Sequence, residues 1–287
     1  MRGHILRWAL VSMAWLPAGA AEPPTTASAP ADFDDGAKER FLLEGRVVRS
    51  KDAGGGITPT LRATLSLDGV EHDAHIQWID QFTPMKNLDG GPEFDFRDSY
   101  LHNVAAYRLD RLLGLGMVPV SVVRLHRRRD AAFTWWVDDV RMDERERRKN
   151  EVQPPDVTRW SREIFVIRVF DELIYNTDRN PGNLLIDGAW RIWMIDHTRA
   201  FKVFKRIGRE EQLGTRCARQ LLAALRGLDE ATLHEKMEDL LSEGQIEGLL
   251  ARRDEIVAYY DAKIADVSEA VVLYDLPPRT GTEPPPR

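Results

Sequence analysis

Residues 175–187 read YNTDRNPGNLLID, and residues 193–197 read WMIDH. The two strings place Asp178 and Asn183 in a polar loop and Asp196 at the end of the apolar hairpin that follows. Phosphoryl transfer needs a carboxylate that orients the nucleophile and hard oxygen ligands that hold Mg²⁺ against nucleotide phosphates. An Asp, an Asn and a second Asp can supply these groups. This stretch is therefore the strongest candidate for the functional centre.

The spacing of these residues is typical of a kinase catalytic loop, in which an Asn follows the catalytic Asp at a fixed short separation. Asp178 and Asn183 have that separation. The string resembles the atypical branch of the protein-kinase-like superfamily, which includes phosphatidylinositol kinases, HipA-type bacterial kinases and secretory-pathway kinases. The resemblance implies that Asp178 is the catalytic base and that Arg179 braces the loop by hydrogen bonds. It also implies that Asn183 and Asp196 ligate Mg²⁺ or Mn²⁺, with ATP as the nucleotide.

A weaker resemblance continues upstream. Residues 103–110 read NVAAYRLD and lead to Val118-Pro119, like the small-lobe helix and the next strand of bacterial members. Kinases pair a strand Lys, which grips the nucleotide phosphates, with a Glu on this helix. Gln77 and Asn103 stand at those two positions here. We expect the two amides to lie near the nucleotide, where they can hydrogen-bond to each other.

The double replacement has two interpretations. It indicates either a retained geometry without charge, as in a pseudokinase, or a subgroup with different phosphate handling. Three cations are candidates for the second case: Lys51, Lys86 and Arg97. A glycine cluster between two predicted strands can fold over phosphates through its backbone N–H groups, or can form a flexible hairpin tip; it comprises Gly54, Gly55 and Gly56.

The candidate site residues also have purely structural interpretations. Asp178 and Asn183 can shape a tight loop, because Asn-x-Asp and Pro-Gly are ordinary turn chemistry. Asp196 ends an apolar strand, where a carboxylate needs a metal or a cation, and Arg199 is an available cation. His197 can be a metal ligand or a core histidine.

The N-terminus has the pattern of a removable signal peptide. Arg2, His4 and Arg7 precede an apolar run over residues 8–16, and Ala18-Gly19-Ala20 follows as a small-residue cleavage pattern. The run is shorter than the roughly 20 residues that span a bilayer. We therefore expect a signal peptide over residues 1–20, an exported mature chain without a membrane span, and periplasmic or extracellular localisation. The lone Cys217 permits no intramolecular disulfide and is expected to be a buried hydrophobe.

The 287 residues are 43% hydrophobic and 30% charged, which is enough for one sizeable core or a small lobe on a larger one. The net charge of -6 gives no general attraction to nucleic acid. The expected fold is α+β and two-lobed, in the manner of a protein kinase. We place a disordered linker at residues 21–38, a small β-rich lobe at 39–137, a second linker at 138–157, a large helical lobe at 158–273 and a disordered tail at 274–287.

Hydrophobic periodicity supports this division. Alternating apolar residues predict strands from Phe41 to about residue 80, and a helix is expected from about Ser99 to Leu113. Strands are predicted over 118–125 and 133–137, followed by a helix capped by Thr158. A hairpin is predicted over 184–195, and two or three helices over 212–267 with a break at 242–244.

Two functions are compatible with the sequence. The first is an exported kinase-like phosphotransferase, which uses Mg²⁺ and nucleotide to phosphorylate a hydroxyl of a protein or a small molecule. The second is a pseudokinase-type binding or scaffolding module. A metal-dependent hydrolase would use the same carboxylates but lacks the several His and Asp ligands of such sites. The phosphate acceptor, and the choice between phosphoryl and adenylyl transfer, are not defined by the sequence.

Overall fold

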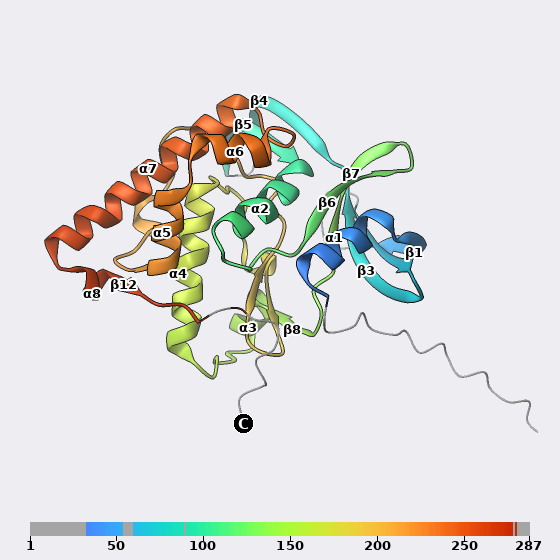
Figure 1. Cartoon of the computed structure of the whole chain (residues 1–287), viewed down its shortest axis with the longest axis horizontal. Coiled ribbons are helices and arrows are strands. Elements are labelled where there is room, and N and C mark those ends of the chain that lie inside the picture. The colour runs from blue at the N-terminus through green and yellow to red at the C-terminus, as the bar shows by residue number, and fades with distance from the viewer. Residues whose placement is uncertain (1–32, 54–59, 89, 278, 280–287) are drawn as a thin grey trace, which may run out of the picture.

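The computed structural model describes residues 33–53, 60–88, 90–277 and 279. It has a β-rich N-terminal part and a mainly helical C-terminal part (Figure 1). This architecture confirms the predicted α+β fold class. The predicted signal peptide and the glycine cluster Gly54, Gly55 and Gly56 lie outside the described residues.

A five-stranded antiparallel sheet forms the N-terminal part. The Asp68-Gly69 pair, with φ of 51° and 80°, makes the tight turn between its second and third strands. Alternate side chains on these two strands are buried, as the sequence pattern predicts. In spatial order the strands are β1 (Arg46–Asp52), β2 (Leu61–Leu67), β3 (Val70–Gln77), β7 (Arg129–Trp135) and β6 (Ser121–His126).

Helix α1 (Asp35–Glu44) covers one face of this sheet. Asp34 caps it by accepting a hydrogen bond from the Ala37 N–H at 2.8 Å. The Phe41 ring is buried, with its centroid 5.7 Å from that of Trp135 on β7. The prediction of a strand beginning at Phe41 is therefore wrong, because this apolar residue anchors a helix on the sheet. The helix also begins inside the range expected to be linker.

Helix α2 (Leu101–Leu112) contacts β6 and β7 and lies within two residues of its predicted bounds at both ends. Between β3 and α2 the chain forms a hairpin that the sequence pattern did not indicate. Its strands are β4 (Asp80–Leu88) and β5 (Gly91–Ser99), which pair only with each other among the described strands. The first eight residues of β4 are all exposed.

The C-terminal part opens with the long helix α4 (Val157–Leu173), whose N-cap is Asp156 rather than the predicted Thr158. Three strands pair in the order β10 (Ile192–Met194), β9 (Leu184–Asp187) and β8 (Val140–Asp143). Strands β9 and β10 form the predicted hairpin. The charged run expected to be linker contains β8 and the short helix α3 (Glu144–Lys149), whose Glu144 is buried and paired with Arg147 and Arg148.

The remaining helices complete the C-terminal part. Ser242, at the predicted break, is the N-cap of the longest of them and forms a capping box with Gln245. Cys217 is buried as predicted, and burial raises the pKa of its thiol to about 12. The elements are η2 (Glu210–Gln212), β11 (Cys217–Ala218), α5 (Arg219–Gly227), α6 (Glu230–Met237), α7 (Glu243–Asp266), α8 (Glu269–Val272) and β12 (Leu273–Tyr274).

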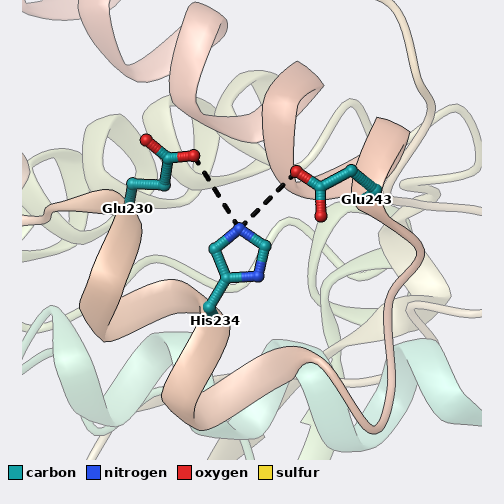
Figure 2. A group of neighbouring side chains, drawn as sticks. All are labelled: Glu230, His234 and Glu243. Atoms are coloured by element: carbon teal, nitrogen blue, oxygen red, sulfur yellow. Dashed lines mark ion pairs between the residues drawn. The ribbon is translucent and has the colours of Figure 1, made fainter.

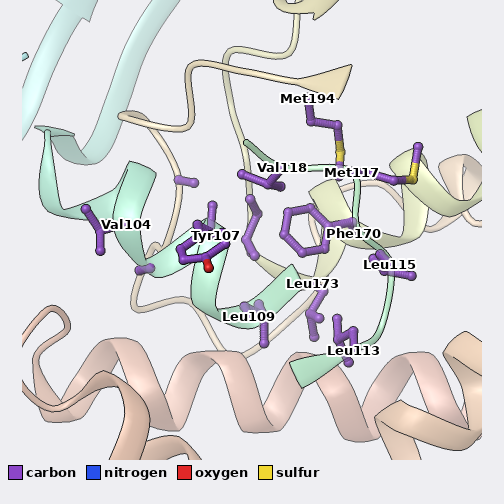
Figure 3. Close-up of a cluster of buried hydrophobic side chains, with 14 of the residues drawn as sticks. Val104, Tyr107, Leu109, Leu113, Leu115, Met117, Val118, Phe170, Leu173 and Met194 are labelled. Carbon is purple, nitrogen blue, oxygen red and sulfur yellow. The ribbon is translucent and has the colours of Figure 1, made fainter. Parts of the chain in front are cut away.

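One continuous hydrophobic core joins the two parts. Leu109 of α2, Phe170 of α4 and Met194 of β10 meet in it (Figure 3). Beyond Tyr274, Arg279 donates to the Glu163 carboxylate at 3.0 Å and to the Ile192 carbonyl at 2.9 Å. None of the described helices combines the length and the apolarity that crossing a membrane requires.

Candidate functional site

The loop after α4 is held by one buried carboxylate, that of Asp171. Arg179 donates to it through Nε and Nη2 at 3.0–3.2 Å. The Asn176 side-chain amide donates to the same carboxylate at 3.0 Å and accepts the Asp178 N–H at 3.0 Å. Each partner of Asp171 therefore restrains the backbone at or beside Asp178.

Arg179 also connects this loop to the strand that leads to Asp196. Its Nη1 donates to the carbonyls of Asn183 and Ile195 at 3.2 and 2.7 Å. The Ile195 N–H in turn donates to the Asn183 carbonyl at 3.0 Å. Arg179 therefore joins the Asp178 loop to the strand before Asp196 by hydrogen bonds.

Asn183 closes a single turn of 3₁₀ helix, η1 (Pro181–Asn183). Its side-chain amide donates to the Asp178 carbonyl at 3.3 Å. Ile195 is hydrogen-bonded to the Asn183 backbone, and Asp196 directly follows Ile195 in the chain. The three residues that the sequence selected are thus joined by direct hydrogen bonds or by one intervening residue.

Asp196 has a left-handed backbone, with φ of 56°, which turns the chain directly after β10. Its Oδ1 accepts a hydrogen bond from the Thr198 hydroxyl at 3.3 Å. Solvent reaches the side chain, yet the surrounding protein, followed by the negative charges of Asp178 and Asp98, raises the pKa of the carboxyl. A bound cation would relieve this repulsion.

Gln77 and Asn103 form the hydrogen bond that the sequence allowed. Asn103 Nδ2 donates to Gln77 Oε1 at 2.8 Å, and both side chains are buried. Asn103 Oδ1 also accepts the N–H of His197 at 2.8 Å. One amide on α2 therefore links β3 to the residue that follows Asp196.

The two neighbours of Asp196 that sequence analysis considered have structural roles. His197 is buried, and its ring centroid lies 6.0 Å from that of Phe170. Burial holds the pKa of its imidazole well below the ordinary value. Among the described residues, Arg199 forms ion pairs with Asp178, at 3.5 Å, and with Glu93, and none with Asp196. The structural alternative in which Arg199 neutralises Asp196 is therefore wrong.

Sequence reasoning missed the residues that the β4–β5 hairpin brings to this loop. Glu93 Oε1 accepts hydrogen bonds from the Thr177 hydroxyl at 3.2 Å and from Lys202 Nζ at 2.7 Å. The Ser99 N–H donates to the Thr198 carbonyl at 3.0 Å, which brings Asp98 close to Asp196. Only the acidic composition of residues 93–98 gave a signal, and it was not specific.

The oxygen atoms of the side chains at this site are suitable ligands for a divalent cation. Asp196 and Asn183 offer a carboxylate and an amide oxygen, and the carboxylates of Asp178 and Asp98 act on Asp196 electrostatically. Carboxylates and amide oxygens are the ligands that Mg²⁺ and Mn²⁺ accept. The oxygen ligands present are therefore of the kind that such a cation accepts.

A second group of metal-ligand side chains lies where α6 is followed by α7 (Figure 2). His234 Nε2 is 3.9 Å from Glu230 and 3.6 Å from Glu243. The two carboxylates are 71% and 62% exposed, so water can solvate them. We assign this group as a surface ion-pair cluster.

No protein family and no curated protein matches the chain by sequence. Solved structures do match it. The structure of hydra Fam20 with sugar has 12% identity and a TM-score of 0.60, over 82% of this chain and 90% of that chain. The Golgi casein kinase has 14% identity and a TM-score of 0.61, over 85% and 80%. The same kinase with Mn/ADP bound has 14% identity and a TM-score of 0.62, over 86% and 81%. These matches show that the chain has a protein-kinase-like fold.

Proposed function

We propose that the protein is a phosphotransferase that uses a nucleotide with Mg²⁺ or Mn²⁺. The observation that carries the proposal is the set of hydrogen bonds by which Asn183 and Arg179 hold the Asp178 loop against Ile195, the residue before Asp196. This set of bonds occurs in a fold whose solved neighbours include a kinase with Mn/ADP bound. A kinase-like site needs little beyond positioning and electrostatic stabilisation of phosphate charge.

In this proposal each residue has one task. Asp196 and Asn183 hold the metal, which when bound neutralises charge on the nucleotide phosphates. Asp178 accepts the proton of the acceptor hydroxyl, and Arg199, 3.5 Å away, orients its carboxylate. Asn103 fixes the backbone after Asp196 relative to Gln77, replacing the usual ion pair by neutral hydrogen bonds.

The acceptor is a hydroxyl of a protein or of a small molecule, and the enzyme acts after export. Export is supported by the sequence pattern over residues 1–20. Among the structural neighbours, one is named as a Golgi casein kinase and another was solved with sugar, which is compatible with an acceptor of either class.

A pseudokinase is the second candidate. It is favoured by the Gln77–Asn103 pair, which keeps the geometry of the strand–helix contact without a phosphate-binding cation. In this case the protein binds nucleotide, and turnover is absent.

Two isosteric variants test the proposal. Asp196→Asn should abolish the thermal stabilisation by ATP with Mg²⁺ or Mn²⁺. Asp178→Asn should keep that stabilisation and slow transfer from radiolabelled ATP by about 100-fold or more, the usual effect of removing a general base. Glu235→Gln, at an exposed carboxylate on α6, is the control and should behave like the parent. The proposal is wrong if the parent gains no stability from metal and ATP, and binding without transfer would identify a pseudokinase.

A further inference from the structure

The resemblance to kinases puts Gln77 at the β3 position of the phosphate-binding Lys, and the Gln77 side-chain oxygen already accepts a hydrogen bond from Asn103. A nucleotide bound beneath this sheet therefore needs a cation from elsewhere. The register of the sheet shows which side chains share a face with Gln77.

Side chains alternate between the two faces of a strand. Asp73 on β3 lies on the same face as Gln77, whereas His72 lies on the other face, where its ring contacts Phe41 of α1 at 6.4 Å between centroids. In the register of the sheet, Thr64 of β2 lies opposite Asp73, and Arg62 of β2 lies opposite His75. Lys51 of β1 lies opposite Arg62. Residues opposite each other on neighbouring strands point to the same face. Lys51 and Arg62 therefore stand on the face of Gln77, opposite α1.

A pocket of about 390 Å³ opens at this place. Its volume lies within the range of small-molecule sites. Three of the lining side chains are cationic and one is anionic. Arg49 is paired with Glu71 at 2.8 Å and Arg62 with Asp73 at 2.6 Å, so the uncompensated positive charge of the pocket is that of Lys51. The lining residues are Arg49, Ser50, Lys51, Arg62, Thr64 and Asp73.

The two central cations differ in how they are held. Arg62 Nε donates to Asp73 at 2.6 Å, and its guanidinium carbon lies 4.2 Å from the ring centroid of Trp136. The Thr64 hydroxyl donates to the other oxygen of Asp73 at 2.6 Å. Arg62 is thus fixed in place, with donors to spare. Lys51 has no ion-pair partner in the part of the chain that the structure describes.

The other two cations that the sequence suggested are already occupied. Lys86 Nζ lies 4.0 Å from the ring centroid of Phe96. Arg97 donates to the Asp95 carboxylate at 3.1 Å and stacks on Phe82 at 4.5 Å. Both belong to the β4–β5 hairpin, outside the sheet that carries Gln77.

We propose that Lys51 and Arg62, on β1 and β2, bind the polyphosphate of the nucleotide in place of a β3 lysine. The inference rests on the proposed function, because it assigns the phosphate-binding groups of the same site. It explains why Gln77 and Asn103 can be neutral: the positive charge has moved to the neighbouring strands.

Calorimetric titration with Mg–ATP, adenosine and tripolyphosphate tests the assignment. Lys51→Gln and Arg62→Gln should each weaken ATP and tripolyphosphate binding by about tenfold or more, which corresponds to roughly 1.4 kcal/mol. Adenosine, which has no phosphate, should bind these variants and the parent equally. Lys86→Gln is the matched control and should leave all three affinities unchanged. Circular dichroism of each variant verifies the fold.

The outcomes separate the two proposals. If the parent binds Mg–ATP and Lys51→Gln and Arg62→Gln bind it equally well, the inference is overturned and the phosphotransferase proposal is untouched. If tripolyphosphate binds through Lys51 but ATP binding does not depend on metal or on Asp196, the anion site is established and the phosphotransferase proposal fails. If the parent binds neither ATP nor tripolyphosphate, both are wrong.

Discussion

Arg179 combines tasks that a lysine cannot. Its guanidinium meets the buried Asp171 carboxylate with two of its nitrogens and reaches two backbone carbonyls with the third. A planar fork of N–H donors can satisfy all these acceptors at once, whereas an ammonium group is a single point. The residue therefore sets the position of the Asp178 loop relative to the strand that precedes Asp196.

Removing this guanidinium should be costly. In Arg179→Ala the Asp171 carboxylate, only 6% exposed, would lose its cation and keep only the Asn176 amide. We expect the free energy of unfolding to fall by about 3–5 kcal/mol, as for other broken buried ion pairs. Urea denaturation measures the change. Arg40→Ala, which removes only exposed ion pairs with Glu44 and Asp68, should leave the free energy of unfolding nearly unchanged. Equal losses in the two variants would contradict a structural role for the Arg179 pair.

The predictability of the site follows from sequence distance. Asp178, Asn183 and Asp196 lie within one short string, so their spacing alone indicates that they meet. Asp98 and Glu93 reach the same place from a hairpin about 80 or more residues upstream, by contacts that no local pattern encodes. Gln77 and Asn103 were accessible only through the family resemblance, which supplied the register.

At the scale of elements, the β4–β5 hairpin depends on a few polar contacts. It has one buried apolar side chain, Phe96, whereas Phe82, Met85 and Phe94 are exposed. Its attachments to the C-terminal part include the pair of Glu93 with Lys202 and the Asp95 carboxylate, which accepts the Val203 N–H at 3.1 Å. This pattern also explains why the hairpin was not predicted: without a buried face, its strands lack the apolar alternation that identifies strands.

Glu93 should therefore control the local stability of the hairpin. Although burial opposes ionisation, the contacts with Lys202 and Arg199 hold the pKa of Glu93 below its ordinary value. Glu93→Ala leaves the buried Lys202 without a carboxylate and should cost about 3 kcal/mol locally, or roughly a hundredfold faster amide exchange over residues 80–99. Hydrogen–deuterium exchange with mass spectrometry measures this rate. Glu247→Ala, at an exposed ion pair on α7, should leave the hairpin unchanged; unchanged exchange in Glu93→Ala would show that Asp95 is a sufficient anchor.

Helix α1 was not predicted for a different reason: it has buried apolar residues, but they follow no periodic pattern. Its two buried residues, Phe41 and Leu42, are adjacent, so the helix shows neither a helical stripe nor an alternating pattern. Only the contact with Trp135 on β7, far along the chain, reveals which face of the sheet it covers. The strands β2 and β3 were predictable because alternate residues are buried in the middle of each.

At the scale of the whole molecule, a buried histidine connects the two parts. His102 on α2 has its Nδ1 2.8 Å from the Thr198 carbonyl and its Nε2 3.0 Å from the Gln245 amide nitrogen on α7. Since the carbonyl can only accept and the amide can only donate, the ring is neutral, with its proton on Nδ1. Protonating Nε2 would set two donors against each other. The pKa of His102 is lowered to about 4, chiefly by burial.

This pKa makes the stability of the fold depend on pH. Between about pH 4 and the ordinary value of 6.5, the unfolded chain binds a proton at His102 that the folded chain does not. Acidification through this range should therefore lower the free energy of unfolding by about 3 kcal/mol from this residue alone. Raised carboxyl pKa values, such as that of Asp110, act in the opposite direction, so the residue must be isolated by a variant. In urea titrations from pH 7 to pH 4, the destabilisation caused by His102→Gln should shrink as the pH falls. If it is the same at both ends of the range, the buried neutral imidazole between α2 and α7 is not what sets the acid sensitivity.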